Sequence, residues 1–412
     1  MHQESLKEHS HVTPLKVLNL YLSNGHSTGP EGSWLYRQFD SIITWDWVLH
    51  RAIDLAPLLY HILTTAGPSD DLKGPVRDSL KSLYKRQLVR HLVQFNELDD
   101  LLQAFDEEAV EVIVLKGADL AFRFYPMVAL RPMLDIDLLV REHDIERAEA
   151  ILRRQGYEFH HTRYEQDRDF WRTKYIHIPY VKQDTDMPVK LDLHFDIEKK
   201  GLQLKADVED FWKHAVPLNG LPNVFCLTEE LLLLYLLWHS YRHLYKELHI
   251  RLSWWLDMAF VLKKSPEIDL IAVREMATGW GIYNHASLYL NLLAELFELE
   301  VKERIKETFP LPGYKSRIFG FIISRSINKP LKRHNSLYEH ILNMLTMHSI
   351  SESMRYAFAI YRQALQRRQQ DIVRGSGYSK AYYILFLIHP LLFAFNTLKW
   401  FTRLTVDVIR DR

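Results

Sequence analysis

The spacing of apolar residues changes twice along this 412-residue chain, and the change limits the fold more than any other feature. From about Trp45 to Phe105, apolar residues recur at three- and four-residue steps, as in amphipathic helices. From Glu111 to about Glu198 the step becomes two, which is typical of strands with one buried face. From Thr228 onward the pattern is helical again. The sequence therefore predicts an α+β fold, in which a small mixed β-sheet core is flanked by N- and C-terminal helical regions.

We place the three regions at residues 1–105, 106–200 and 201–412. In the middle region we expect strands in "EVIVLKG", "LDIDLLV", "KYIHIPYVK" and "MPVKLDLHFDI". One helix, "HDIERAEAILRRQGY", separates the second strand from the third, and Asp144 can cap it while Gly156 can end it. The last two strands are expected to form a hairpin that turns at Gln183–Asp186.

Composition narrows the class of protein. With 47% hydrophobic and 25% charged residues, the chain can bury a large core. Its 52 basic and 52 acidic residues give no net attraction to nucleic acid, so we expect no nucleic-acid partner. Cys226 is the only cysteine, which excludes an intrachain disulfide and a multi-cysteine zinc site. The N-terminus lacks a basic segment followed by an apolar one, and the expected compartment is the cytoplasm.

Carboxylates interrupt two of the expected strands. Asp135 and Asp137 lie in the apolar run "RPMLDIDLLV", where alternation places both on one strand face and the apolar residues on the other. Asp192 and His194 share the polar face of "VKLDLHF". Three carboxylates brought together on one sheet face would repel one another and resist ionisation unless divalent cations neutralised them. The pattern therefore predicts a site for hard metal ions such as Mg²⁺.

The order Leu-Lys-Gly, then Asp-x-Asp, then a later Asp on a strand resembles a known family. "VLKGADLAFRFYP", "RPMLDIDLLV", "AILRRQGYEF" and "VKLDLHFDI" are similar to the uncharacterised bacterial nucleotidyltransferases of the polymerase-beta superfamily. The similarity is densest over Val112–Phe195 and continues more weakly to about Asp257. It implies a nucleotidyltransferase core, two Mg²⁺ or Mn²⁺ ions and a nucleoside triphosphate donor.

The resemblance also implies roles for individual residues. Asp135 and Asp137 match the metal-binding pair, and Asp192 matches the third catalytic carboxylate, so all three would bind metal. Lys116 and Gly117 match the turn beside the nucleotide phosphates.

In one position the chain departs from the superfamily pattern. Ala118 follows Gly117, where Ser or Gly is usual, so no side-chain hydroxyl can bind a phosphate there. Donor binding would then depend on backbone N–H groups and on cations such as Lys116 or Arg131. Each candidate also has a structural interpretation: Lys116 as a solvated strand end and Arg131 as an ion pair with the acids. His194 could orient a carboxylate or the acceptor, or be a hydrogen-bonded structural histidine.

His239 and His243 lie four residues apart on a helical pattern, which is a zinc-ligand spacing. Zinc is not expected, because the run "HSYRH" lacks the Glu of a metalloprotease motif. These histidines and Asp257 resemble residues in the helical region of the family, where they would line an acceptor pocket or pack against the catalytic sheet.

The C-terminal part raises the question of a membrane. Tyr382–Phe401 is apolar, but four residues interrupt it: His389, Pro390, Asn396 and Lys399. The preceding Arg355–Gly375 is basic and amphipathic, so the two segments could lie on the inner face of an anionic membrane. Packing against the protein's own core is the alternative that we favour.

Together these observations predict transfer of a nucleoside monophosphate from a nucleoside triphosphate to a hydroxyl or phosphate acceptor. A sugar, a phosphorylated peptide and a protein side chain are candidate acceptors, by analogy with polysaccharide and peptide natural-product tailoring. A nucleotide-sugar glycosyltransferase also uses Asp-x-Asp, but such folds need alternating strands and helices before the motif, where this chain has helices. A catalytically silent nucleotide-binding scaffold is the other alternative, and the intact carboxylates argue against it.

Overall fold

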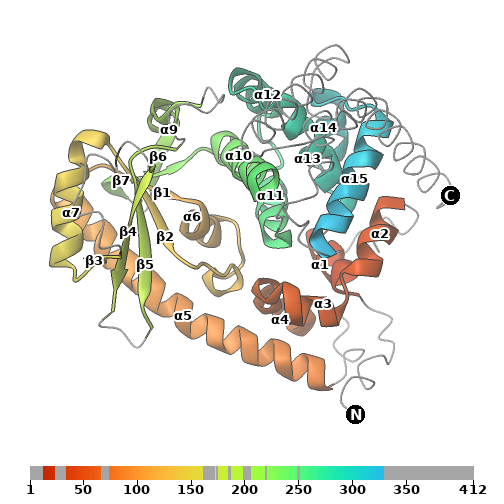
Figure 1. Ribbon diagram of the computed structural model, residues 1–412, viewed down its shortest axis with the longest axis horizontal. Coiled ribbons are helices and arrows are strands. Elements are labelled where there is room, and N and C mark those ends of the chain that lie inside the picture. The colour runs from red at the N-terminus through yellow and green to blue at the C-terminus, as the bar shows by residue number, and fades with distance from the viewer. Residues whose placement is uncertain are drawn as a thin grey trace, which may run out of the picture.

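The computed structural model describes residues 13–23, 34–65, 74–160, 172, 175–183, 187–197, 206–218, 220–247 and 251–328. Within these ranges the fold is α+β, with one mixed sheet and helices on both of its faces, which confirms the predicted fold class (Figure 1). Segments 355–375 and 382–401, which raised the membrane question, lie outside the described residues. No helix in the described part of the chain is both long enough and apolar enough to cross a bilayer.

The sheet orders its described strands as β3-β4-β5-β2-β1-β7-β6. Their bounds are β1 (Val112–Leu115), β2 (Ile136–Val140), β3 (Glu158–Phe159), β4 (His177–Lys182), β5 (Val189–His194), β6 (Ala215–Leu218) and β7 (Leu221–Leu227). Strand β2 pairs antiparallel with β1 and parallel with β5. Strands β4 and β5 pair antiparallel, as the predicted hairpin requires, although the centre of its turn, residues 184–186, is not described.

Three strands were not predicted: the two-residue β3, and β6 and β7. We expected only helices after residue 201, but β6 and β7 form the far edge of the sheet. Both carry residues that are unusual in strands, Pro217 in β6 and Pro222 in β7, which hid the pattern. Strand β7 nevertheless pairs parallel with β1, since Val224 aligns with Val112. The sheet therefore extends to Leu227.

Helices precede and follow the sheet as predicted. They are α1 (Pro14–Leu22), α2 (Trp34–Ile42), α3 (Trp45–Arg51), α4 (Ala56–Thr65), α5 (Gly74–Glu107), α6 (Lys116–Arg123), α7 (Ile145–Arg154), α9 (Val208–Lys213), α10 (Glu229–Glu247), α11 (Leu252–Lys264), α12 (Leu270–Gly279), α13 (Tyr283–Leu296), α14 (Lys302–Thr308) and α15 (Gly313–Asn328). Short 3₁₀ helices are η1 (Ile53–Leu55), η3 (Val128–Leu130) and η4 (Glu142–Asp144).

The predicted helix between β2 and β3 is α7, and its two ends differ from expectation in one respect. Asp144 occupies the N-cap position, but its side chain accepts no backbone hydrogen bond; its Oδ1 instead accepts from Arg147 Nη1 at 2.7 Å. Gly156 lies just after the helix with a φ of 82°, in the left-handed region that favours glycine. The prediction for Gly156 is therefore confirmed, whereas Asp144 stabilises the first turn through a side-chain ion pair.

Alternation along the strands separates two apolar layers. Leu138 and Val140 of β2 and Leu191 of β5 pack in one cluster with α7 and the C-terminal half of α5. Leu139, from the other face of β2, belongs to a second cluster with α6 and the helices that follow the sheet. The odd-numbered face of β2, which carries Asp137, therefore faces α6 and α10 (Figure 1).

Helix α5 joins the two parts of the molecule. It is 34 residues long and runs without interruption along one side of the fold (Figure 1). Its C-terminal half, including Leu101 and Phe105, packs on the sheet. Its N-terminal half lies against α4, where Leu80 enters the helical cluster. The middle of α5 is thereby placed beside the end of β2 that carries the acids.

Candidate active site

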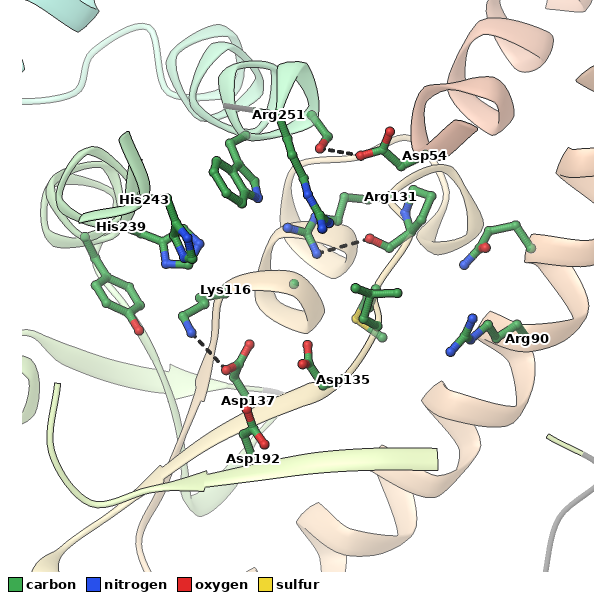
Figure 2. A pocket seen from close by; sticks show the side chains of 18 of the residues that line it. Asp54, Arg90, Lys116, Arg131, Asp135, Asp137, Asp192, His239, His243 and Arg251 are labelled. Atoms are coloured by element: carbon green, nitrogen blue, oxygen red, sulfur yellow. Dashed lines mark hydrogen bonds and ion pairs between the residues drawn. The ribbon is translucent and has the colours of Figure 1, made fainter. Parts of the chain in front are cut away.

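The register of β2 and β5 brings the three predicted carboxylates together. Parallel pairing places Asp137 directly opposite Asp192, and Asp135 lies one residue before β2. All three line a single cavity of about 610 Å³. Figure 2 shows their side chains on the strand-built side of this cavity, with Lys116 beside Asp137. The prediction that these residues share one sheet face agrees with this arrangement.

Asp137 is the best compensated of the three. Its Oδ1 accepts from Lys116 Nζ at 2.9 Å and from His194 Nε2 at 2.8 Å. Burial alone would raise the pKa of Asp137, but the Lys116 charge and the His194 hydrogen bond hold it well below its usual range. Burial alone would likewise lower the pKa of Lys116, and the charge of Asp137 raises it instead. Both groups are therefore charged at neutral pH.

Asp135 and Asp192 have no such partners. Among the described residues, neither accepts a hydrogen bond from a lysine or an arginine, and the contact of Asp192 Oδ2 with His177 Nε2 is 3.6 Å long. Burial, followed by the charges of Asp137 and Asp135, raises the pKa of Asp192 from 3.8 to about 7. Burial and then the charge of Asp137 also raise the pKa of Asp135. This end of the cavity carries more negative charge than its described cations balance.

Lys116 and Gly117 make the sharp change of direction from β1 into α6, of which they are the first two residues. Lys116 has a φ of 44°, in the left-handed region that is strained for a residue with a side chain. Gly117 is required for a different reason: a Cβ at this position would lie 2.5 Å from Arg131 Nη1 and 3.3 Å from the side chain of Met133. The missing side chain thus leaves room for the Arg131 guanidinium to cross the start of α6.

Arg131 forms an ion pair, but with a partner that we did not predict. Its Nη2 donates to Asp257 Oδ2 at 2.9 Å and its Nε to Asp257 Oδ1 at 3.2 Å, instead of pairing with Asp135 or Asp137. Asp257 is 0% exposed and also accepts from the Tyr125 hydroxyl at 2.8 Å. Counting Nη1 on Pro132 O, three of the five guanidinium N–H groups donate to described residues, so two remain for a ligand. Arg131 is a cavity-lining residue and Asp257 is its support.

His239 and His243 line the same cavity from α10. Their ring centroids are 4.5 Å apart, and each ring also contacts Trp254 of α11, at 5.1 Å and 4.8 Å. Figure 2 shows the two histidines above Lys116, on the side of the cavity away from α5. Aromatic faces of this kind suit stacking of a planar ring. Trp254, which completes the cluster, was not predicted.

The sequence analysis also did not predict that α5 forms one wall of the cavity. Arg86 and Arg90 lie four residues apart and line the cavity with Gln87 between them. In the described part of the chain no carboxylate pairs with either arginine. In Figure 2, Arg90 points toward Asp135 from the side opposite Lys116. The run "KRQLVRHL" carries these charges, but nothing in it tells which face of a 34-residue helix meets the acids.

Beneath this wall, His91 holds the loop that leads to Asp135. Its Nδ1 donates to Val128 O at 2.8 Å, and its Nε2 accepts from the Met133 backbone N–H at 3.0 Å. A ring that donates through one nitrogen and accepts through the other is neutral, and burial lowers the pKa of His91 to about 4. His91 is therefore a positioning residue for the acidic end of the cavity.

His177 is a further residue that the sequence analysis did not select. It lies on β4 directly opposite His194 of β5, and the two ring centroids are 5.1 Å apart. One ring nitrogen of each histidine and one oxygen of Asp192 lie within 4.8 Å of one another. His194, a candidate whose role the sequence analysis left open, donates a hydrogen bond to Asp137 and packs against the ring of His177.

Comparison with known proteins gives one match. The model of a protein family described as "Uncharacterised nucleotidyltransferase" matches residues 41–298, which is more than half of the chain. The matched range contains the cavity walls and all three carboxylates. No curated protein and no solved structure matches the chain.

Proposed function

Because the chain belongs to this uncharacterised nucleotidyltransferase family, we propose that it transfers a nucleoside monophosphate from a nucleoside triphosphate to a hydroxyl or phosphate acceptor. Asp135, Asp137 and Asp192 are the proposed metal-binding and catalytic carboxylates. The observation that carries the proposal is the register of β2 and β5, which aligns Asp137 with Asp192 beside Asp135 in one cavity.

The residues present fit divalent cations. Asp135 and Asp192 lie in a cavity without a lysine or arginine partner among the described residues, and their pKa values are raised because negative charge accumulates there. Carboxylate oxygens are the ligands that Mg²⁺ prefers, and we propose Mg²⁺ or Mn²⁺, two ions in all. Once bound, such ions supply charge neutralisation for the acids and for the triphosphate.

Side chains of the protein have separate roles in the proposed reaction. The acceptor oxygen attacks the α-phosphorus, the bond from that phosphorus to the bridging oxygen breaks, and pyrophosphate leaves. Asp192 accepts the proton of an acceptor hydroxyl, for which a carboxylate with a raised pKa is suited. Lys116 and the two remaining N–H groups of Arg131 lie beside Gly117 and bind triphosphate oxygens.

The two remaining walls suggest how donor and acceptor are placed. We assign the nucleobase to the aromatic cluster of His239, His243 and Trp254, which lies on the Lys116 side of the acids. The acceptor would then approach along α5, where Arg86 and Arg90 favour an anionic group such as a phosphate. A phosphorylated peptide or phosphorylated sugar, of the kind modified in natural-product tailoring, would place its phosphate against Arg86 and Arg90. A protein side chain next to a phosphate would do the same.

The test is a donor screen with the purified full chain. Each nucleoside triphosphate, labelled at the α-phosphate, is incubated with Mg²⁺ or Mn²⁺ and candidate sugars, phosphopeptides and proteins, and transfer is scored by label and by mass. We expect transfer that Asp135→Asn abolishes, that Asp192→Asn lowers at least about a hundredfold, and that Asp78→Asn, at an exposed acid on α5, leaves unchanged. Full transfer by both cavity variants would refute the assignment of these carboxylates.

For the C-terminal segments 355–375 and 382–401, peripheral contact with an anionic membrane is the alternative to packing on the protein's own core, which we favour. Sedimentation of the full chain with vesicles rich in phosphatidylserine, at low and high salt, distinguishes the two. Salt-sensitive co-sedimentation would support membrane contact, and failure to sediment at low salt would assign the segments to the core.

A further inference from the structure

We propose that the end of the cavity around Asp192 is a mixed nitrogen and oxygen site, formed by His177, Asp192 and His194, which selects a first-row transition cation over Mg²⁺. This inference rests on the proposed function in one respect only, because it identifies a ligand set for one of the cations assigned to that cavity. It adds two histidine ligands to a site that would otherwise consist of carboxylates alone.

The sheet register carries the first step. His177 and His194 are directly paired residues of β4 and β5, and Asp192 lies two residues before His194 on the same face of β5. Adjacent strands thus present all three side chains to one point. One ligand atom of each lies within 4.8 Å of the others. Ligands on opposite sides of a transition cation are about 4.2 Å apart, for bonds of about 2.1 Å, so small side-chain movements close the site.

The hydrogen bond of His194 carries the second step. Asp137 is an acceptor only, so the 2.8 Å contact assigns the proton of His194 to Nε2. The other nitrogen, Nδ1, then has a free lone pair. It is buried and has no hydrogen-bond partner among the described residues, and the side chain as a whole is 3% exposed. A buried acceptor without a partner is costly, and a cation bound at Nδ1 would satisfy it.

The same hydrogen bond resembles the arrangement that supports metal-binding histidines in general. Such a histidine binds the cation through one nitrogen and donates its other N–H to a carboxylate, which fixes the ring and makes the ligand more basic. Asp137 provides that carboxylate for His194, and Lys116 holds Asp137 in place from the other side. Two imidazoles and one carboxylate favour Mn²⁺, Fe²⁺, Co²⁺ or Zn²⁺, whereas Mg²⁺ prefers oxygen ligands alone.

The experiment uses Mn²⁺ as the probe, because its unpaired electrons report on bound nitrogen. The full chain is loaded with Mn²⁺ and studied by electron spin echo modulation, with a second sample labelled with ¹⁵N-histidine. We expect a ¹⁴N modulation that changes to the ¹⁵N pattern in the labelled protein, without any substitution. Titration should show Mn²⁺ binding that a tenfold excess of Mg²⁺ does not displace.

Variants then identify the ligands. His177→Gln should remove part of the nitrogen modulation and weaken Mn²⁺ binding by at least about tenfold. His143→Gln, an exposed histidine outside the cavity, is the matched control and should change neither measurement. Thermal melting of each variant without metal shows whether the variant is folded. If a variant does not fold, the ¹⁵N-labelled wild-type protein still tests the inference.

The outcomes separate this inference from the proposed function. Mn²⁺ bound without nitrogen modulation overturns the histidine ligands and leaves a carboxylate site, with which the proposed nucleotidyl transfer is compatible. No binding of Mn²⁺ or Mg²⁺, with or without a triphosphate, overturns both. Nitrogen modulation in a protein that transfers no nucleotide supports the site and contradicts the activity.

Discussion

Asp257 and Asp192 differ both in how deeply they are buried and in how far nearby groups balance their charge. Asp257 is fully buried, and its two oxygens accept from Arg131 and from Tyr125. Asp192 is 23% exposed, has only a long contact with His177, and has a raised pKa. We therefore propose that the more deeply buried acid is the structural one. The contrast indicates that uncompensated negative charge in a cavity is a better pointer to a functional carboxylate than burial by itself.

The sharpest test of this contrast is Asp137→Asn. Asp137 lines the cavity beside Asp192, but like Asp257 it is paired with a buried cation, here Lys116. The variant should lose transfer to the background level. It should also lose about 3–5 kcal/mol of unfolding free energy, since Lys116 is left buried without its counter-charge. Single-turnover assays and urea unfolding measure the two effects. Wild-type stability would show that Lys116 finds another partner.

Asp257→Asn should affect stability directly, and donor binding only through the position of Arg131. It leaves the Arg131 guanidinium buried beside a neutral amide, and we expect a loss of about 3–5 kcal/mol. Urea unfolding measures it, and Asp54→Asn, at an acid bonded to Ser253 on the cavity rim, is a milder comparison. A neutral result would mean that Asp257 is no more structural than Asp192.

Asp192→Asn should show the opposite behaviour. Transfer should fall at least about a hundredfold, the scale for loss of a positioned base. Affinity for the donor triphosphate should change by less than about tenfold, because Lys116, Arg131 and Asp137 remain. Stability without metal should stay constant or rise, since a source of repulsion is removed. Calorimetry beside single-turnover transfer makes the test, and equal losses in both would assign Asp192 to donor binding.

Gly117→Ala tests the close packing of Gly117 against Arg131. Its Cβ would meet Arg131 Nη1 at 2.5 Å, and Arg131 cannot move without stretching its bonds to Asp257. We expect a loss of about 1–3 kcal/mol, as for other overpacked sites. Gly279→Ala, where nothing lies within 4 Å of the added carbon, is the control. Equal unfolding midpoints for the two variants would remove the packing argument.

The smallest expected effect is on the pH dependence of stability. Asp192 has a raised pKa in the folded protein, so the folded state binds more protons than the unfolded state between pH 3.8 and about 7. Its contribution to stability is complete below pH 3.8 and is lost as the pH rises toward 7. Urea unfolding of the metal-free protein over this range should therefore show a shallower fall for Asp192→Asn. Parallel curves would contradict the raised pKa.

The carboxylates could be predicted from sequence because strand alternation and the family pattern both point to Asp135, Asp137 and Asp192. The partner of Arg131 could not, since Asp257 lies 126 residues later on a separate helix. His177 was missed for a related reason: its alignment with His194 depends on the hairpin register, which the sequence of a loop does not determine. The prolines of β6 and β7 concealed two strands that only pairing with β1 stabilises.

Helix α5 also sets the distance between the arginine wall and the sheet. Between Arg90 and Leu98 it contains no glycine or proline, so at about 1.5 Å per residue these positions are about 12 Å apart along a continuous rod. One inserted or deleted residue there would rotate the wall by about 100° away from the acids. Substitutions at Arg86, Gln87 and Arg90 leave the rod and the sheet unchanged. If the acceptor binds at this wall as proposed, acceptor preference can change through substitutions at these three positions while the number of residues between the wall and the sheet stays constant.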